Sequence, residues 1–99
     1  MEPSNLLKIS TLDHEWRDKD KVILHACFQI LMDFVESEMY SSHVDWDGDQ
    51  GLKEAENEIK ALYKWWLEYS KNESDEEEAY QIENQMLMRL IAIRHILWT

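Results

Sequence analysis

The segment that decides the fold is residues 22–39, which read VILHACFQILMDFVESEM. Between Val22 and Val35 only His25, Gln29 and Asp33 are polar, and these three are spaced four residues apart. On an α-helix, positions four residues apart form one narrow line along one side. A helix that is apolar around the rest of its circumference packs against several neighbours in the middle of a fold. The segment therefore predicts a central helix over residues 20–39.

The polar line formed by His25, Gln29 and Asp33 has two interpretations. The simpler one is that it is the solvent-facing line of the central helix. The other is that it lines a cleft between helices and meets Arg89 or Arg94 there. The spacing of the residues does not decide between the two.

The composition indicates one packed domain built from long helices. The chain has 99 residues, of which 44% are hydrophobic, and it contains only two glycines and one proline. A chain of this length forms a single domain with a single core. The scarcity of helix-breaking residues favours long helices over many short strands.

Two further helices are expected, over residues 52–70 and 75–98. The first has one apolar seam with a spacing of three and four residues: Leu52, Ala55, Ile59, Leu62, Trp66 and Tyr69. The second begins with a capping box formed by Ser74 and Glu77, with Asp75 beside it. It carries two adjacent seams, Ala79, Ile82, Met86, Leu90, Ile93 and Leu97 in one, and Tyr80, Leu87, Ile91 and Trp98 in the other.

The expected fold class is therefore all-α, a compact three-helix domain with a short N-terminal extension. Two adjacent seams allow the third helix to contact two neighbours at once. At about 1.5 Å per residue this helix is also longer than the core of a three-helix domain needs. A homodimer through the third helix is therefore expected.

The charge balance disfavours direct binding to nucleic acid or to an anionic membrane. The formal net charge is −11, and phosphate contacts need clustered Lys and Arg side chains. The single cysteine, Cys27, suits a reducing compartment. With no signal-like stretch and no apolar run long enough to span a membrane, a soluble cytoplasmic protein is expected.

The acidic loop between the first two helices resembles a calcium-binding loop in part. With Asp45 at its first position, the loop places Asp47, Asp49 and Glu56 at the third, fifth and twelfth positions. However, Gln50 replaces the turn glycine, and Lys53 stands at the ninth position. The alternative is a solvated acidic loop that caps the following helix.

No spacing typical of an enzyme is present. His25 and Cys27 are two residues apart, so on a helix they point in nearly opposite directions and cannot form a nucleophile–base pair. The four histidines have no zinc-ligand spacing, and the chain has no glycine-rich phosphate loop. We therefore expect no catalytic residues and no cofactor.

The aromatic side chains offer a candidate partner-binding surface. Trp46, Tyr63 and Trp65 could form an exposed patch of the kind found at the centres of interfaces, or could instead cover the edges of a small core. A separate possibility is that an oligomer sequesters a nucleotide between aromatic rings and the cationic side chains of Lys64, Arg89 or Arg94.

Several segments resemble small uncharacterised proteins of tailed bacteriophages. They are residues 24–36 (LHACFQILMDFVE), 62–66 (LYKWW), 86–94 (MLMRLIAIR) and 97–99 (LWT). The resemblance covers most of the chain from His14 onward. It implies a phage origin and a location in the cytoplasm of an infected bacterium. It implies no activity and no site residues.

Size, charge and the absence of catalytic spacing together predict a non-enzymatic accessory protein. We expect it to act by stoichiometric binding to a host bacterial protein, in host takeover or counter-defence. Its acidic surface could imitate a phosphate backbone and occupy a nucleic-acid-binding protein. Nucleotide sequestration and calcium binding are the two alternatives.

Overall fold

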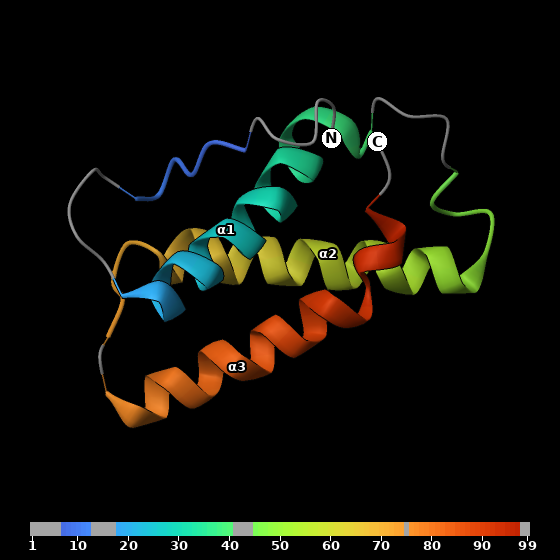
Figure 1. The fold of residues 1–99 in the computed structure, drawn as a ribbon. Helices are drawn as coiled ribbons and strands as arrows, with labels where there is room; N and C mark the ends of the chain where they lie inside the picture. Colours follow the sequence, from blue (N-terminus) through green and yellow to red (C-terminus); the bar gives the residue numbers. More distant parts are fainter. Residues whose placement is uncertain (1–6, 13–17, 41–44, 75, 98–99) are drawn as a thin grey trace.

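The computed structural model describes residues 7–12, 18–40, 45–74 and 76–97. It is an all-α domain of three helices, α1 (Lys19–Asp33), α2 (Gln50–Tyr69) and α3 (Glu77–Ala92), each of which contacts the other two (Figure 1). A π-helical turn, η1 (Phe34–Glu38), extends α1, and a 3-10 turn, η2 (Arg94–Ile96), follows α3. The described part of the chain contains no strand. The predicted fold class is confirmed.

The core forms between the apolar side of α1 and the seam of α2. Phe28 of α1 is fully buried and stacks on Trp66 of α2, with 4.8 Å between the ring centroids. Four residues of the predicted α2 seam are buried: Ala55, Ile59, Leu62 and Trp66. The single-seam prediction for this helix is therefore confirmed.

The central helix does not continue as an α-helix to residue 39. At Phe34 the hydrogen bonding changes to the π pattern, and the amide of Met39 donates to the carbonyl of Phe34 across 2.7 Å. A π turn brings residues five apart to the same side of a helix. Phe34 and Met39 are both buried as a result.

The third helix is shorter than predicted. Its N-cap is Glu76 rather than Ser74, and the Ser74 hydroxyl accepts a hydrogen bond from the Glu76 amide at 3.2 Å. At its other end the α-helix stops at Ala92, and η2 follows. Asp75, the acidic residue expected beside the capping box, and the seam residue Trp98 lie outside the described residues.

Residues 7–12 form the described part of the N-terminal extension and lie against α1. Ser10 and Thr11 hydrogen-bond side chains of α1. None of the described helices combines the length and the apolar character needed to cross a membrane.

Candidate functional site

Two of the three residues of the polar line of α1 are buried and the third, Asp33, is half-buried, so the solvent-facing interpretation is wrong. His25 is only 2% exposed and Gln29 is buried as well. The Oε1 atom of Gln29 accepts hydrogen bonds from the amide and the hydroxyl of Ser10, both at 2.9 Å, and its Nε2 donates to Asp33 at 2.8 Å. The line therefore faces a protein interior, but its partners are not Arg89 or Arg94.

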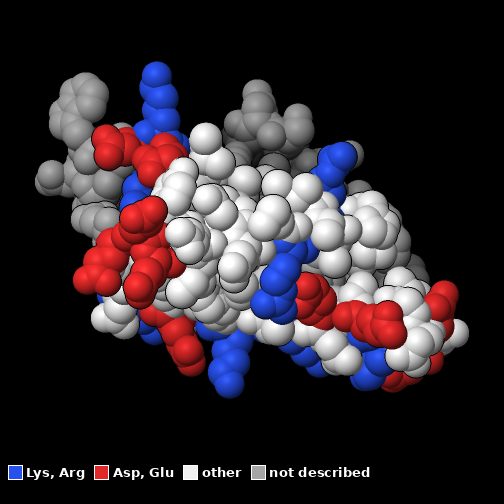
Figure 2. Space-filling model, turned by 90° about the horizontal axis from the view of Figure 1, so that it is seen from below, with Lys and Arg blue, Asp and Glu red and all other residues white. Residues whose placement is uncertain are grey.

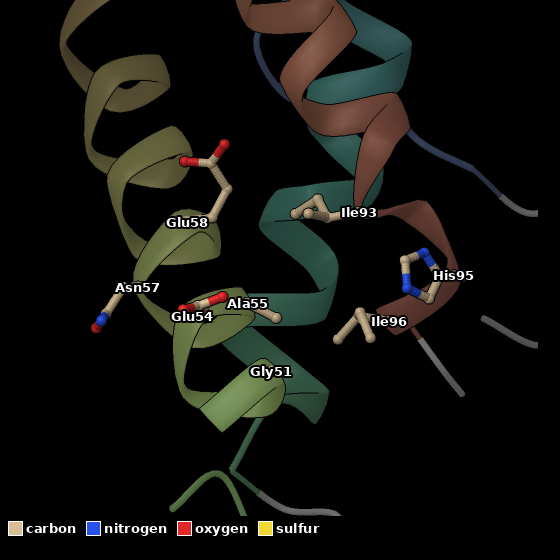
Figure 3. Close-up of a pocket in the computed structure, with 8 residues that line it drawn as sticks. All are labelled: Gly51, Glu54, Ala55, Asn57, Glu58, Ile93, His95 and Ile96. Carbon is tan, nitrogen blue, oxygen red and sulfur yellow. The ribbon is translucent and has the colours of Figure 1, made fainter. Parts of the chain in front are cut away.

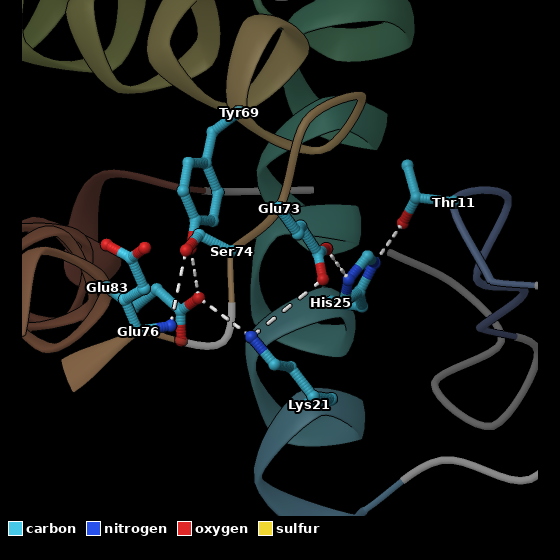
Figure 4. A network of polar contacts seen from close by, with 8 residues as sticks. All are labelled: Thr11, Lys21, His25, Tyr69, Glu73, Ser74, Glu76 and Glu83. Carbon is cyan, nitrogen blue, oxygen red and sulfur yellow. Dashed lines mark hydrogen bonds and ion pairs between the residues drawn. The ribbon is translucent and has the colours of Figure 1, made fainter. Parts of the chain in front are cut away.

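His25 joins three parts of the chain. Its Nε2 meets the carboxylate of Glu73, its Nδ1 lies 2.6 Å from the Thr11 hydroxyl, and its ring packs edge-on against Trp66 (Figure 4). Because a carboxylate can only accept, Nε2 carries a proton, and in the neutral ring Nδ1 accepts from Thr11. Both ring nitrogens are thus satisfied, which is the condition for burying a histidine.

A second group of polar contacts lies beside His25 and connects all three helices. Lys21 of α1 lies 2.9 Å from the Glu83 carboxylate of α3, and the Tyr69 hydroxyl at the end of α2 donates to the same carboxylate (Figure 4). Burial, followed by the hydrogen bond to Glu83, raises the pKa of Tyr69 far above its usual value. Because Lys21 of α1 and Tyr69 of α2 both bind the carboxylate of Glu83 of α3, this cluster links the three helices.

The acidic loop is attached to the core through Trp46. Trp46 is 6% exposed, its indole nitrogen donates to the carbonyl of Met39 at 3.0 Å, and its ring meets Phe34 edge-on. The prediction of an exposed patch containing Trp46 is therefore wrong. Around this anchor the loop closes on itself, because the amide of Gly48 donates to the carbonyl of Asp45 at 3.1 Å.

The four candidate calcium ligands do not converge on one point. Asp49 is the N-cap of α2 and accepts from the amide of Gly51 at 2.7 Å, while Asp47 lies 3.1 Å from Lys53. Glu56 is buried and is bonded to Lys53 at 3.0 Å. Within the described ranges, no group of three or more His, Cys, Asp or Glu side chains is placed to hold a metal. The geometry agrees with the alternative of a loop that caps the next helix.

Glu56 is instead the centre of an acid–base cluster. Besides Lys53 it contacts the Tyr40 hydroxyl at 3.0 Å and the Lys60 ammonium at 3.7 Å. The hydrogen bond from Lys53 is the main cause that lowers the pKa of Glu56. The ammonium groups of Lys53 and Lys60 already neutralise this carboxylate, so they compete with a calcium ion for it.

Tyr63 and Trp65 brace α2 against the central helix. The Tyr63 hydroxyl donates to Glu36 of η1 at 2.9 Å. Trp65 stacks on Tyr69 with 4.7 Å between ring centroids and lies against Phe28. Both rings are partly buried, so they cover the edge of the core, as in the alternative interpretation of the aromatic residues.

The cationic candidates for nucleotide binding are dispersed. Arg89 of α3 donates to both carboxylate oxygens of Glu58 of α2, and the contact from its Nε measures 2.9 Å. Arg94 is exposed on η2, and Lys64 is exposed on α2. A bidentate pair already occupies the guanidinium of Arg89.

A pocket of about 550 Å³ lies between the first turns of α2 and the turn η2 that follows α3 (Figure 3). Its lining includes the carboxylates of Glu54 and Glu58 and the apolar side chains of Ile93 and Ile96. The Glu54 carboxylate disfavours a phosphate group by like-charge repulsion, and Glu58 is already paired with Arg89. The pocket therefore offers no support for nucleotide sequestration.

The outer side of α3 is not covered by any of the residues that the structure describes. Tyr80 and Ile91, two members of its predicted second seam, are exposed, as is Met88 beside them. Most of the middle of this face is uncharged, although basic side chains also lie there, and most of its acidic side chains gather toward its two ends (Figure 2). Residue spacing identified the seam, but only the packing of the three helices shows that the described neighbours leave it open.

Comparisons of this chain with protein-family models, with curated proteins and with solved structures give no match.

Proposed function

We propose that this protein is a non-enzymatic accessory protein that acts by stoichiometric binding to a host bacterial protein with a basic surface. The observation that carries the proposal is the attachment of the acidic loop, residues 45–49, to the core through the buried ring of Trp46. Asp45, Asp47 and Asp49 are exposed, and the loop that carries them is attached to the core by Trp46.

A fixed acidic loop binds at a lower entropic cost than a mobile one. Each loop or side chain that becomes ordered on association loses conformational entropy, which reduces the affinity. A loop that is already attached to the core loses less entropy on binding. The net charge of −11 adds long-range attraction, which accelerates the encounter with a basic partner. A surface that normally binds phosphates has the matching charge, which supports nucleic-acid mimicry as the mode of action.

The resemblance to small tailed-phage proteins supports the biological setting of the proposal. A phage protein made in an infected bacterium meets host proteins at high concentration, and a stoichiometric inhibitor needs no catalytic residue. Host takeover and counter-defence are the roles that such binding would serve.

The proposal is tested by affinity capture from bacterial lysate, followed by calorimetry with the recovered partner. Replacing Asp45 and Asp47 with Asn removes two charges from the loop and keeps its hydrogen-bonding shape. The matched control replaces Asp18 and Asp20 with Asn, which removes two charges from the start of α1. We expect the loop variant to weaken binding about tenfold and the control to change it less than about twofold, since charge pairs at a contact exceed remote ones in effect.

Two results would contradict the proposal. One is equal loss of affinity in the loop variant and the control, which would mean that only the total charge matters. The other is a recovered partner whose affinity does not fall as salt is raised, since binding between opposite charges weakens with ionic strength.

A further inference from the structure

The pocket between α2 and η2 has an apolar inner part and an acidic rim (Figure 3). Ala55 on α2 is buried, and Ile93 and Ile96 on the opposite side are half-buried and pack against the core. In Figure 3 the side chain of Ile96 points toward α2. Glu54 also lines the pocket, but it is exposed to solvent. A ligand that fits both parts has an apolar stem and a polar end.

The charge at the rim favours a cation. The Glu54 carboxylate accepts a hydrogen bond from the side-chain amide of Gln50 at 3.3 Å, and no cationic group of the described residues pairs with it. Glu58, in contrast, is bound by two nitrogens of Arg89. One carboxylate of the pocket is therefore available to a ligand, and it attracts a positive charge and repels a negative one.

An alkylammonium group matches this combination better than a guanidinium does. The methylene stem of a lysine lies along apolar surface while its strongly hydrated ammonium group stays in water, as an apolar interior with an open rim requires. A guanidinium is suited to a carboxylate that accepts two parallel hydrogen bonds. In this pocket the carboxylate that binds in that way, Glu58, already holds Arg89.

The pocket lies directly beside the acidic loop, residues 45–49. Gly51 lines the pocket, and its amide donates to the carboxylate of Asp49, the last residue of the loop, at 2.7 Å. A partner that meets the loop with a basic surface therefore also faces the rim of the pocket. Lysine side chains are part of any such surface that normally binds phosphates.

We propose that this pocket takes up one lysine side chain of the basic partner, with the stem against Ile93 and Ile96 and the ammonium group at Glu54. The inference rests on the proposed function, because it identifies the place where the basic partner inserts a side chain. A side chain that fills a pocket fixes the orientation of the partner, whereas the exposed charges of the loop accelerate the encounter. The pocket and the loop thus have separate roles in one interface.

The first test is an NMR titration with n-pentylammonium, which has the stem and the charge of a lysine side chain. We expect saturable shifts of the amide signals of Gly51, Glu54 and Ile96. Nuclear Overhauser contacts should join the methylene protons of the probe to the methyl groups of Ile93 and Ile96. Pentanol has the stem without the charge, and the ammonium ion has the charge without the stem, so both should bind more weakly by about threefold or more. Equal binding of pentanol, or shifts spread over the acidic residues of all three helices, would overturn the proposal.

The second test separates the pocket from the net charge. Glu54→Gln should weaken binding of n-pentylammonium about threefold. The matched control is Glu68→Gln, which removes the same charge from an exposed position of α2 about 21 Å along the helix, and it should leave the affinity unchanged. Equal losses in the two variants would mean that only the total charge attracts the probe, and the proposal would fall.

The apolar part of the pocket is tested in the same titration. Ile96→Ala should weaken binding about fivefold, because it removes apolar surface from the wall of the pocket. Its control is Ile91→Ala, at an exposed isoleucine of α3 outside the pocket, which should have no effect. Circular dichroism verifies that helicity is kept. If Ile96→Ala loses helicity, the contacts between the probe and the Ile96 methyl groups in the wild type decide the matter.

The third test distinguishes a protein side chain from a free polyamine. A blocked tripeptide with lysine between two glycines should bind within about threefold of n-pentylammonium, and its arginine counterpart should bind more weakly. If 1,5-diaminopentane binds more than about tenfold tighter than the lysine peptide, the occupant is a free diamine and the proposal is wrong. None of these probes requires the host protein. The pocket can therefore fail while partner capture from lysate succeeds, and capture can fail while the pocket binds the probes.

Discussion

At the residue scale, His25 shows how this fold uses a buried polar group. One ring nitrogen of His25 is hydrogen-bonded to Thr11 and the other contacts the carboxylate of Glu73. Three segments that are distant in sequence therefore meet at this imidazole. The spacing of His25, Gln29 and Asp33 identified the polar line correctly. It could not identify the partners, because Ser10, Thr11 and Glu73 are brought in by the tertiary fold.

Removing the His25 side chain should be costly. His25→Ala leaves the Glu73 carboxylate with only the Lys21 ammonium at 3.9 Å, removes the histidine partner of the Thr11 hydroxyl and opens a cavity beside Trp66. We expect a loss of about 2–4 kcal/mol in the free energy of unfolding, measured by urea denaturation. The matched control is His95→Ala, at an exposed histidine, which should change stability by no more than about 0.5 kcal/mol. Equal effects of the two substitutions would mean that the contacts of His25 are not stabilising.

At the element scale, the ends of the helices are held by side chains from their neighbours. The amphipathic period predicted α2 to within two residues at its start and one at its end, because a single seam leaves only one way to bury the helix. The period predicted less well where geometry changes within an element, as at η1. Nothing in the letters FVESE marks a π turn, which arises because Phe34 and Met39 both reach the core.

The contact of Tyr69 with Glu83 should make stability depend on alkaline pH. In the folded protein the raised pKa keeps the Tyr69 hydroxyl protonated, whereas the unfolded chain loses that proton near pH 10. The folded state then binds more protons than the unfolded state, so stability falls as pH rises above this value. Tyr69→Phe should be about 1 kcal/mol less stable at neutral pH, and its loss of stability between about pH 10 and pH 12 should be shallower. An unchanged slope in denaturation midpoints across this range would contradict the expectation.

At the scale of the whole molecule, the excess of acidic groups works against compactness. Acids gather near the start of α2 and the start of α3, and the formal net charge is −11. The composition gives this excess of acidic residues directly. It does not show which acidic side chains form ion pairs, because the cationic partners of Glu56, Glu58 and Glu83 are brought close by the tertiary fold.

Moderate salt should therefore stabilise the protein. Raising sodium chloride from about 0.01 M to 0.15 M shortens the screening length from roughly 30 Å to 8 Å and reduces repulsion between the acidic regions. A gain of about 1 kcal/mol would raise the midpoint of thermal unfolding by about 4–8 °C at fixed protein concentration. Calcium chloride at matched ionic strength should give the same shift. A larger shift with calcium would indicate a specific site at Asp45, Asp47, Asp49 and Glu56.

Lys21 and Glu83, which are in contact, lie 62 residues apart in the sequence, so this contact can form only after most of the chain has been synthesised. At about 5–20 residues per second, α1 leaves the ribosome several seconds before the helix that supplies Glu83. During that interval α2 and the N-terminal segment, residues 7–12, are the described elements that can cover its apolar surface. Chains that stop after α2 would keep part of this surface permanently open, and cellular proteases would degrade them in preference to the finished protein. Quality control of this small protein thus depends on the completion of its last helix.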